Sequence, residues 1–156
     1  MKQTLSDTKR AVIWFLAVYV LINIPATGLY FLIALIMGIP LSGPNEIIHD
    51  PAYLLSQKLY PILNLLFWLF ASWKYFSKSP YAKPDYNEAI KLGLFWLIIA
   101  LPMDLIVYVL IPTPLSLSFN DFYHGQFPWI YFTYLSVFIS PLFYIVLKKK
   151  WQINSK

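Results

Sequence analysis

The sequence contains no cysteine among its 156 residues. Disulfides, thiolate nucleophiles and cysteine-ligated zinc or iron–sulfur centres are therefore excluded. The motifs Gly-x-x-x-x-Gly-Lys-Ser/Thr, Gly-x-Gly-x-x-Gly, His-Glu-x-x-His and Gly-x-Ser-x-Gly are absent as well. We accordingly expect no bound cofactor, and the sequence argues against an enzyme.

Charged residues are also scarce. They make up 12% of the chain, against roughly 25% in soluble domains, and hydrophobic residues make up 59%. Arginine occurs once, at Arg10, which argues against an arginine-rich voltage-sensing span. The other eleven of the twelve basic residues are lysines, a bias that suggests an AT-rich bacterial genome. The net charge of +5 does not indicate nucleic-acid binding, because the basic residues lie at the ends of apolar runs.

The apolar residues form four long runs, which lie at about 11–38, 53–76, 88–111 and 128–147. A helix that crosses a bilayer needs about 20 mostly apolar residues, and each run provides them. The sequence therefore predicts an all-α integral membrane protein of the cell membrane. We expect one domain, a four-span transmembrane helical bundle with the lipid bilayer around it.

The first run has two interpretations. Pro25 lies near its centre and predicts a kink or a tilt of one long helix. Alternatively, residues 1–28 form a cleaved signal peptide, with a basic start and small residues Ala26 and Gly28 at the cleavage spacing. The apolar residues 29–37 favour the continuous span.

The positions of the basic residues predict the orientation. Eleven of the twelve occur in the N-terminal tail, in and beside the loop 77–87, and in the C-terminal tail, at Lys2, Lys9, Arg10, Lys74, Lys78, Lys83, Lys91, Lys148, Lys149, Lys150 and Lys156; the exception is Lys58, near the outer end of the second span. The loops 39–52 and 112–127 contain none. The positive-inside rule therefore predicts a bundle with both termini in the cytoplasm, an N-in/C-in topology.

Each predicted span carries one stripe of polar, small or amphipathic side chains at helical spacing. The candidate interior residues are Asp104, Asn64, Asn23, Thr133, Ser136 and Lys58. Asp104 is the most informative, because an ionisable side chain inside a span costs about 2.5–3.5 kcal/mol and usually has a function. We expect it to point into the bundle, near Asn64 and Thr133 at a similar depth. Interhelical hydrogen bonding alone accounts for the asparagines, serines and threonines.

A second set of polar residues lies in the loops predicted to be outside. His49, Asp50, Asp121 and His124 are of the types that bind zinc. Their spacing matches no specific motif, and ordinary solvated loops have the same content. We therefore do not favour a metal site.

Three functions remain after these exclusions. The favoured one is a non-catalytic membrane partner, a regulatory or assembly subunit that binds another membrane protein or a second copy of itself. The alternative is a small proton- or cation-coupled transport protein with Asp104 in its pathway. A metal-dependent enzyme, within the membrane or at its outer surface, is the most distant. A cavity at Asp104 favours transport, and a sealed, hydrogen-bonded Asp104 favours the partner subunit.

Overall fold

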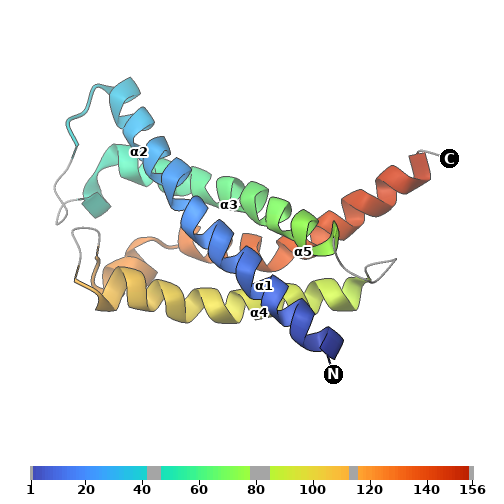
Figure 1. Ribbon diagram of the computed structural model, residues 1–156. Helices are drawn as coiled ribbons and strands as arrows, with labels where there is room; N and C mark the ends of the chain where they lie inside the picture. The colour runs from blue at the N-terminus through green and yellow to red at the C-terminus, as the bar shows by residue number, and fades with distance from the viewer. Residues whose placement is uncertain (1, 42–46, 78–84, 113–115, 155–156) are drawn as a thin grey trace.

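A computed structural model of the chain describes residues 2–41, 47–77, 85–112 and 116–154, and every regular element within them is helical (Figure 1). The long helices are α1 (Lys2–Leu21), α2 (Asn23–Met37), α3 (Pro51–Ser77), α4 (Tyr86–Asp104) and α5 (Trp129–Asn154). The short helices are η1 (Ile47–His49), η2 (Leu105–Leu110) and η3 (Asp121–Gly125).

Four helical segments of the described chain are long and apolar enough to cross a membrane. They are Asp7–Met37, Pro51–Ser77, Tyr86–Leu110 and Trp129–Trp151. The prediction of four long apolar helices is thus confirmed, with helix ends that differ by a few residues. Of the lysines used to predict the orientation, Lys78, Lys83 and Lys156 lie outside the described residues.

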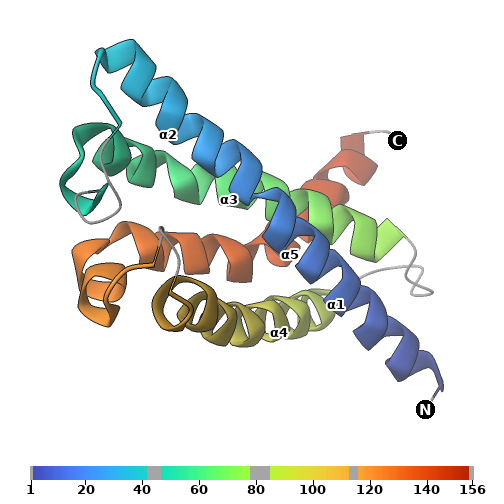
Figure 2. The same ribbon diagram turned by 60° about the vertical axis from the view of Figure 1, so that its left-hand side comes forward.

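The helices form a bundle with both chain ends on one side (Figure 1). The most extensive packing joins α3 to α5 and α4 to α5. α1 crosses the bundle beside α3, and α2 continues in nearly the same direction and packs on α3 (Figure 2). The half of the bundle far from the termini therefore contains α2, the start of α3, the end of α4 and the start of α5.

The first long helix is interrupted near Pro25, but its two segments continue in nearly the same direction. α1 ends at Leu21 and α2 begins at Asn23, with Ile22 as a turn between them. Pro25 has no backbone N–H to donate to the Leu21 carbonyl four residues earlier, so one bond of the helical ladder is missing at this point. The ladder is otherwise maintained, since the amide of Ala26 donates to the Ile22 carbonyl at 3.0 Å.

α3 begins two residues earlier than the apolar pattern predicted. The Asp50 carboxylate accepts hydrogen bonds from the backbone amides of Ala52 at 2.7 Å and Tyr53 at 3.3 Å. It therefore caps the helix, and Pro51 takes the first helical position, where a missing N–H has no cost. The second Asp50 oxygen accepts from the Tyr30 hydroxyl at 2.8 Å, which fixes α2 to the start of α3.

The segment 112–127 was expected to be a loop, and this prediction is wrong in part. It contains η3, and the Phe122 side chain of that helix is buried. Phe122 stacks on Tyr108 of η2 with ring centroids 5.7 Å apart. Burying an aromatic side chain stabilises the structure enough to fold this segment back onto the bundle.

The half of the bundle near the termini contains an aromatic core, which includes Phe15, Trp68, Tyr75 and Trp96. The ring centroids of Trp68 and Trp96 are 5.1 Å apart, and those of Phe15 and Trp68 are 5.4 Å apart. α4 and α5 approach closely here, because Gly93 leaves room for the Phe138 carbonyl.

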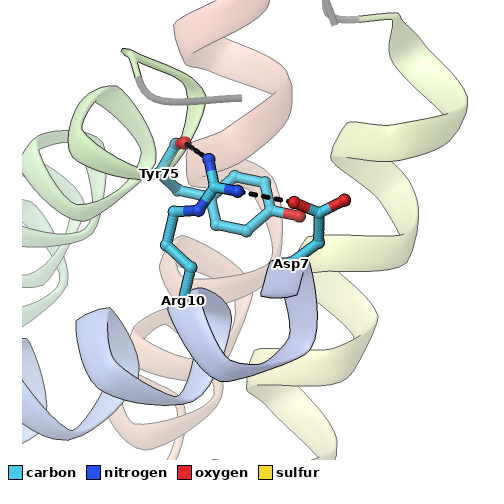
Figure 3. Close-up of polar contacts among 3 residues, drawn as sticks. All are labelled: Asp7, Arg10 and Tyr75. Atoms are coloured by element: carbon cyan, nitrogen blue, oxygen red, sulfur yellow. Dashed lines mark hydrogen bonds and ion pairs between the residues drawn. The ribbon is translucent and has the colours of Figure 1, made fainter. Parts of the chain in front are cut away.

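Arg10, the single arginine, joins α1 to α3 at the end of the bundle where the termini lie (Figure 3). Its guanidinium donates to the Tyr75 backbone carbonyl at 3.3 Å and to Asp7 at 2.5 Å. The same guanidinium carbon lies 5.4 Å from the centre of the Tyr75 ring. A planar fork of donors can make these contacts together, whereas the ammonium of a lysine is a point charge.

Candidate functional site

A cavity of about 410 Å³ lies between the helices in the half of the bundle away from the termini. Its wall comes from α1, α2, α3, α4, η2, η3 and α5, with Leu41, Ile47, Leu117 and Gln126 from between the helices. This volume lies within the roughly 300–1,000 Å³ of typical small-molecule sites. Trp68 both lines the cavity and belongs to the aromatic core, so the core closes the cavity at that end.

Asp104 lines this cavity and is partly buried. It is the last residue of α4, and the π-helix η2 follows it directly. π-helical turns are rare and occur often at functional sites. One Asp104 oxygen, Oδ1, accepts a hydrogen bond from the Tyr19 hydroxyl at 2.7 Å. This bond joins the end of α1 to the end of α4.

The Tyr134 hydroxyl lies beside the same carboxyl group. The Tyr134 residue is 7% exposed, and its hydroxyl makes no well-formed hydrogen bond with any described residue. A buried polar group without a partner is uncommon in native structures, because it carries the full cost of its desolvation. The Tyr134 hydroxyl faces the Asp104 carboxyl, with Tyr123 also beside it.

Asn64 and Thr133 line the cavity as well, but they are not the partners of Asp104 that we expected. The Asn64 amide donates to the Tyr60 carbonyl at 3.0 Å, and its oxygen accepts from the Trp68 indole at 3.3 Å. Thr133 donates to a carbonyl of its own helix at 3.1 Å. The expectation was wrong because these side chains satisfy their hydrogen bonds within their own helices, which a depth argument does not consider.

Asn23, the first residue of α2, connects the first long helix to η2. Its amide donates to the Tyr19 carbonyl at 2.7 Å, and its oxygen accepts from the Tyr108 hydroxyl at 2.6 Å. Two hydrogen bonds thus join the first long helix to the segment formed by α4 and η2: Tyr19 to Asp104, and Tyr108 to Asn23. The four residues form a network that fixes the position of the Asp104 carboxyl in the cavity wall.

The other two interior candidates lie elsewhere. Ser136 is buried, but its hydroxyl donates to the Thr133 carbonyl at 2.7 Å and does not line the cavity. Lys58 is exposed, so its assignment to the interior is wrong. A flexible four-carbon chain lets an ammonium group reach a polar environment, which avoids the cost of burial.

The four possible metal ligands of the loops do not form a site. No group of three or more histidines, aspartates or glutamates that can hold a metal occurs in the described parts of the chain. Asp50 is occupied as the cap of α3, and Asp121 accepts a hydrogen bond from Ser118 at 2.6 Å. His49 and His124 are both exposed.

Sequence analysis missed several residues of the cavity wall. Tyr134 lies next to Thr133, just outside the stripe that a strict spacing of three and four residues selects. Gln57 and Gln126 also line the cavity, and Gln126 donates to the Tyr53 hydroxyl at 3.2 Å. The signal available in the sequence was the abundance of tyrosine, which occurs twelve times.

The charge of the cavity wall is unbalanced. Asp104 is the only acidic residue among the described residues that line it, and no lysine, arginine or histidine does so. Aromatic residues supply much of the rest, namely Tyr19, Tyr30, Phe31, Tyr53, Tyr60, Trp68, Tyr108, Phe122 and Tyr134. The protein thus presents one carboxyl group, without a basic partner, to a space surrounded by aromatic side chains.

A second cavity, of about 490 Å³, lies near the termini. Its wall contains Asp7, Asp85, Glu88 and Lys91, and two of these acids already have structural partners. Asp7 contacts Arg10, and Asp85 caps α4 by accepting from the Glu88 amide at 2.7 Å. This cavity also contains a basic residue, Lys91, whereas no described lysine, arginine or histidine lines the Asp104 cavity, so we take the Asp104 cavity as the stronger candidate site.

No protein family, curated protein or solved structure matches this chain. Its function is therefore inferred from the Asp104 cavity.

Proposed function

We propose that this chain is a small membrane transport protein whose pathway includes the Asp104 cavity, where Asp104 binds a proton or a cation. One observation carries the proposal: the carboxyl group lies in the wall of a 410 Å³ cavity in which no described residue offers a positive charge. An isolated carboxylate in an apolar environment is costly unless it takes up a proton or a cation. A purely structural role in a partner subunit does not need such a cavity.

The surface of the helices supports insertion in a membrane. Large apolar side chains remain exposed along every long helix; among them, Leu35 is 79% and Ile98 is 67% exposed. Soluble monomers rarely expose apolar patches on this scale. At the end near the termini, the ammonium groups of Lys74 and Lys149 lie 4.3 Å and 3.8 Å from the rings of Trp73 and Tyr86. Aromatic rings beside lysines are typical of the membrane–water interface.

The proposed orientation places the end with the termini in the cytoplasm and the Asp104 cavity in the outer half of the membrane. A reporter enzyme that is active only outside the cytoplasm is expected to be active when fused at Pro44 or Ser118. The same reporter is expected to be silent at Lys83 or after Lys156, because the basic residues keep these positions inside. Of these fusion sites, Ser118 alone lies within the described residues. The opposite activity pattern would contradict the orientation.

Charge movement through the purified protein tests the proposed function. Vesicles that contain the protein are adsorbed on a capacitive electrode and exposed to jumps in proton, sodium, potassium or 4-phenylbutylammonium concentration. We expect a current in at least one jump that Asp104→Asn reduces roughly tenfold or more, since a neutral amide loses the charge-assisted interaction. Protein-free vesicles measure the signal from the lipid alone.

Asp121→Asn is the matched control for this experiment. It removes a carboxylate from the same half of the molecule, yet Asp121 does not line the cavity. Its currents are expected to equal those of the wild type. Identical currents from the wild type and Asp104→Asn in all four jumps would contradict transport and leave the partner-subunit hypothesis.

A further inference from the structure

We propose that the ligand of the Asp104 cavity is an organic ammonium ion with at least one N–H group and an apolar body. This inference rests on the proposed function and names its substrate class. The ammonium group binds at Asp104 and Tyr134, and the apolar body lies among the aromatic side chains of the wall.

The charge of the wall selects a cation. Asp104 has no basic neighbour among the described lining residues, so a bound cation supplies the opposite charge that the protein lacks. The aromatic wall acts in the same direction, because the face of an aromatic ring attracts cations. The carboxylate and the faces of the aromatic rings would repel a bound anion, and no described lining residue offers a positive charge to offset this repulsion.

The composition of the wall selects an organic cation over a divalent metal ion. Divalent metal ions need several oxygen or nitrogen ligands around one point. The described residues contain no such group, and one carboxyl does not make one. In contrast, a space of about 410 Å³ lined mainly by tyrosine, tryptophan, phenylalanine and aliphatic residues suits an apolar body.

The hydrogen bonds of the wall select an ammonium with an N–H group. Most of the tyrosine hydroxyls already have partners in the protein: those of Tyr19, Tyr30, Tyr53, Tyr60 and Tyr108 bond to Asp104, Asp50, Gln126, Ala26 and Asn23. The Tyr134 hydroxyl alone has no well-formed bond, and it lies beside the Asp104 carboxyl. The Tyr19 hydroxyl donates to Oδ1 of Asp104, and we assign the ligand to Oδ2, the other oxygen of the carboxyl group.

An ammonium group placed there satisfies both positions. It donates one N–H to Oδ2 of Asp104 and a second N–H to the hydroxyl oxygen of Tyr134. A quaternary ammonium has no N–H and makes neither hydrogen bond, although it keeps the charge and the contacts with the rings. The site should therefore prefer a primary amine to its trimethylated analogue.

Binding measurements on the protein in lipid nanodiscs test this proposal with three ligands that share the 4-phenylbutyl group. These are 4-phenylbutylammonium, its N-trimethyl analogue and the neutral 4-phenylbutan-1-ol. We expect the primary amine to bind the wild type roughly tenfold or more tightly than the alcohol, since charged hydrogen bonds are the stronger ones. The trimethyl analogue is expected to bind with intermediate affinity.

Variants assign the selectivity to individual residues. Asp104→Asn is expected to lower the affinity for the primary amine roughly tenfold or more, while Asp121→Asn leaves it unchanged. Tyr134→Phe is expected to remove much of the preference for the primary amine over the trimethyl analogue. The comparison of ligands on the wild type needs no variant, so it stands even where a substitution prevents folding.

Equal affinities for the amine and the alcohol, or equal affinities of the wild type and Asp104→Asn for the amine, would overturn the proposal. These outcomes are separable from the failure of transport. Amine binding at Asp104 without charge movement supports the ligand class and contradicts transport. Sodium or potassium currents that depend on Asp104, without amine binding, support transport and overturn the ligand class.

Discussion

Gly93→Ala is expected to destabilise the protein by about 1–3 kcal/mol or more, the usual cost of overpacking a core. A Cβ atom at Gly93 would lie 2.2 Å from the carbonyl oxygen of Phe138 and 3.1 Å from its carbonyl carbon. Both atoms belong to the backbone of α5, so no side-chain rotation relieves the clash. α4 and α5 would have to separate, and with them the wall on which Asp104 and Tyr134 face each other.

Gly28→Ala provides the matched control. Gly28 also lies in a long helix, α2, but a Cβ there would have no neighbour within 4 Å. Alanine is the better helix former by about 1 kcal/mol, so this variant is expected to be as stable as the wild type or slightly more stable. Thermal unfolding in detergent, followed by circular dichroism, compares the two. A Gly93→Ala protein as stable as Gly28→Ala would show that α4 and α5 do not pack this closely.

Trp96→Ala is expected to have the second large effect, a loss of about 3–5 kcal/mol, the range found for removal of buried large aromatics. The Trp96 side chain is fully buried and packs against Trp68 and Tyr75, with centroid separations of 5.1 Å and 6.5 Å. Its indole N–H also donates to the Ala11 carbonyl at 3.0 Å, which fixes α1 to α4. The substitution leaves a cavity in the centre of the aromatic core.

Trp96→Phe separates packing from hydrogen bonding. Phenylalanine keeps a ring in the core but loses the indole donor, so the expected cost is smaller, with about 1 kcal/mol from the hydrogen bond. Denaturant or thermal unfolding of both variants gives the comparison. Equal destabilisation by Trp96→Phe and Trp96→Ala would show that the bond to Ala11, and not the aromatic packing, holds α1 in place.

The four long helices could be predicted because their lengths follow from the thickness of a bilayer and from continuous apolar runs. The interruption of the first long helix near Pro25 followed from the missing N–H of proline. Asp104 stood out for a similar reason: a carboxyl group in an apolar span is costly at any rotation of the helix. Each of these predictions uses residues within one helix, so it needs no information about how the helices pack together.

The partners of Asp104 could not be obtained in the same way. Asn64 and Thr133 were expected from their depth, whereas the actual hydrogen bond comes from Tyr19 on the first long helix. Depth gives the height of a residue within the bundle, but the rotation of each helix decides which side chains meet. That rotation depends on close contacts such as Gly93 against Phe138, which the sequence of one helix does not reveal.

The prediction of a loop over residues 112–127 was wrong in part for a different reason. The prolines and polar residues of this segment are typical of a loop, and the apolar Phe122 among them was not weighed against these signals. The structure shows that one buried aromatic residue, stacked on Tyr108, accompanies a turn of helix over the end of the cavity. Short aromatic segments between spans are therefore worth considering as parts of the wall.

The aromatic core at the end of the cavity nearer the termini has a kinetic consequence if the proposed transport function holds. Under the proposed function and orientation, a ligand bound at Asp104 would leave toward the cytoplasm only when Phe15, Trp68 and Trp96 move apart, and their close packing opposes that motion. Collective helix movements of this kind take microseconds to milliseconds or longer, much longer than the rotation of an exposed side chain. The turnover rate should therefore be set by the separation of these rings, and ligands of very different affinity should share nearly the same maximal rate.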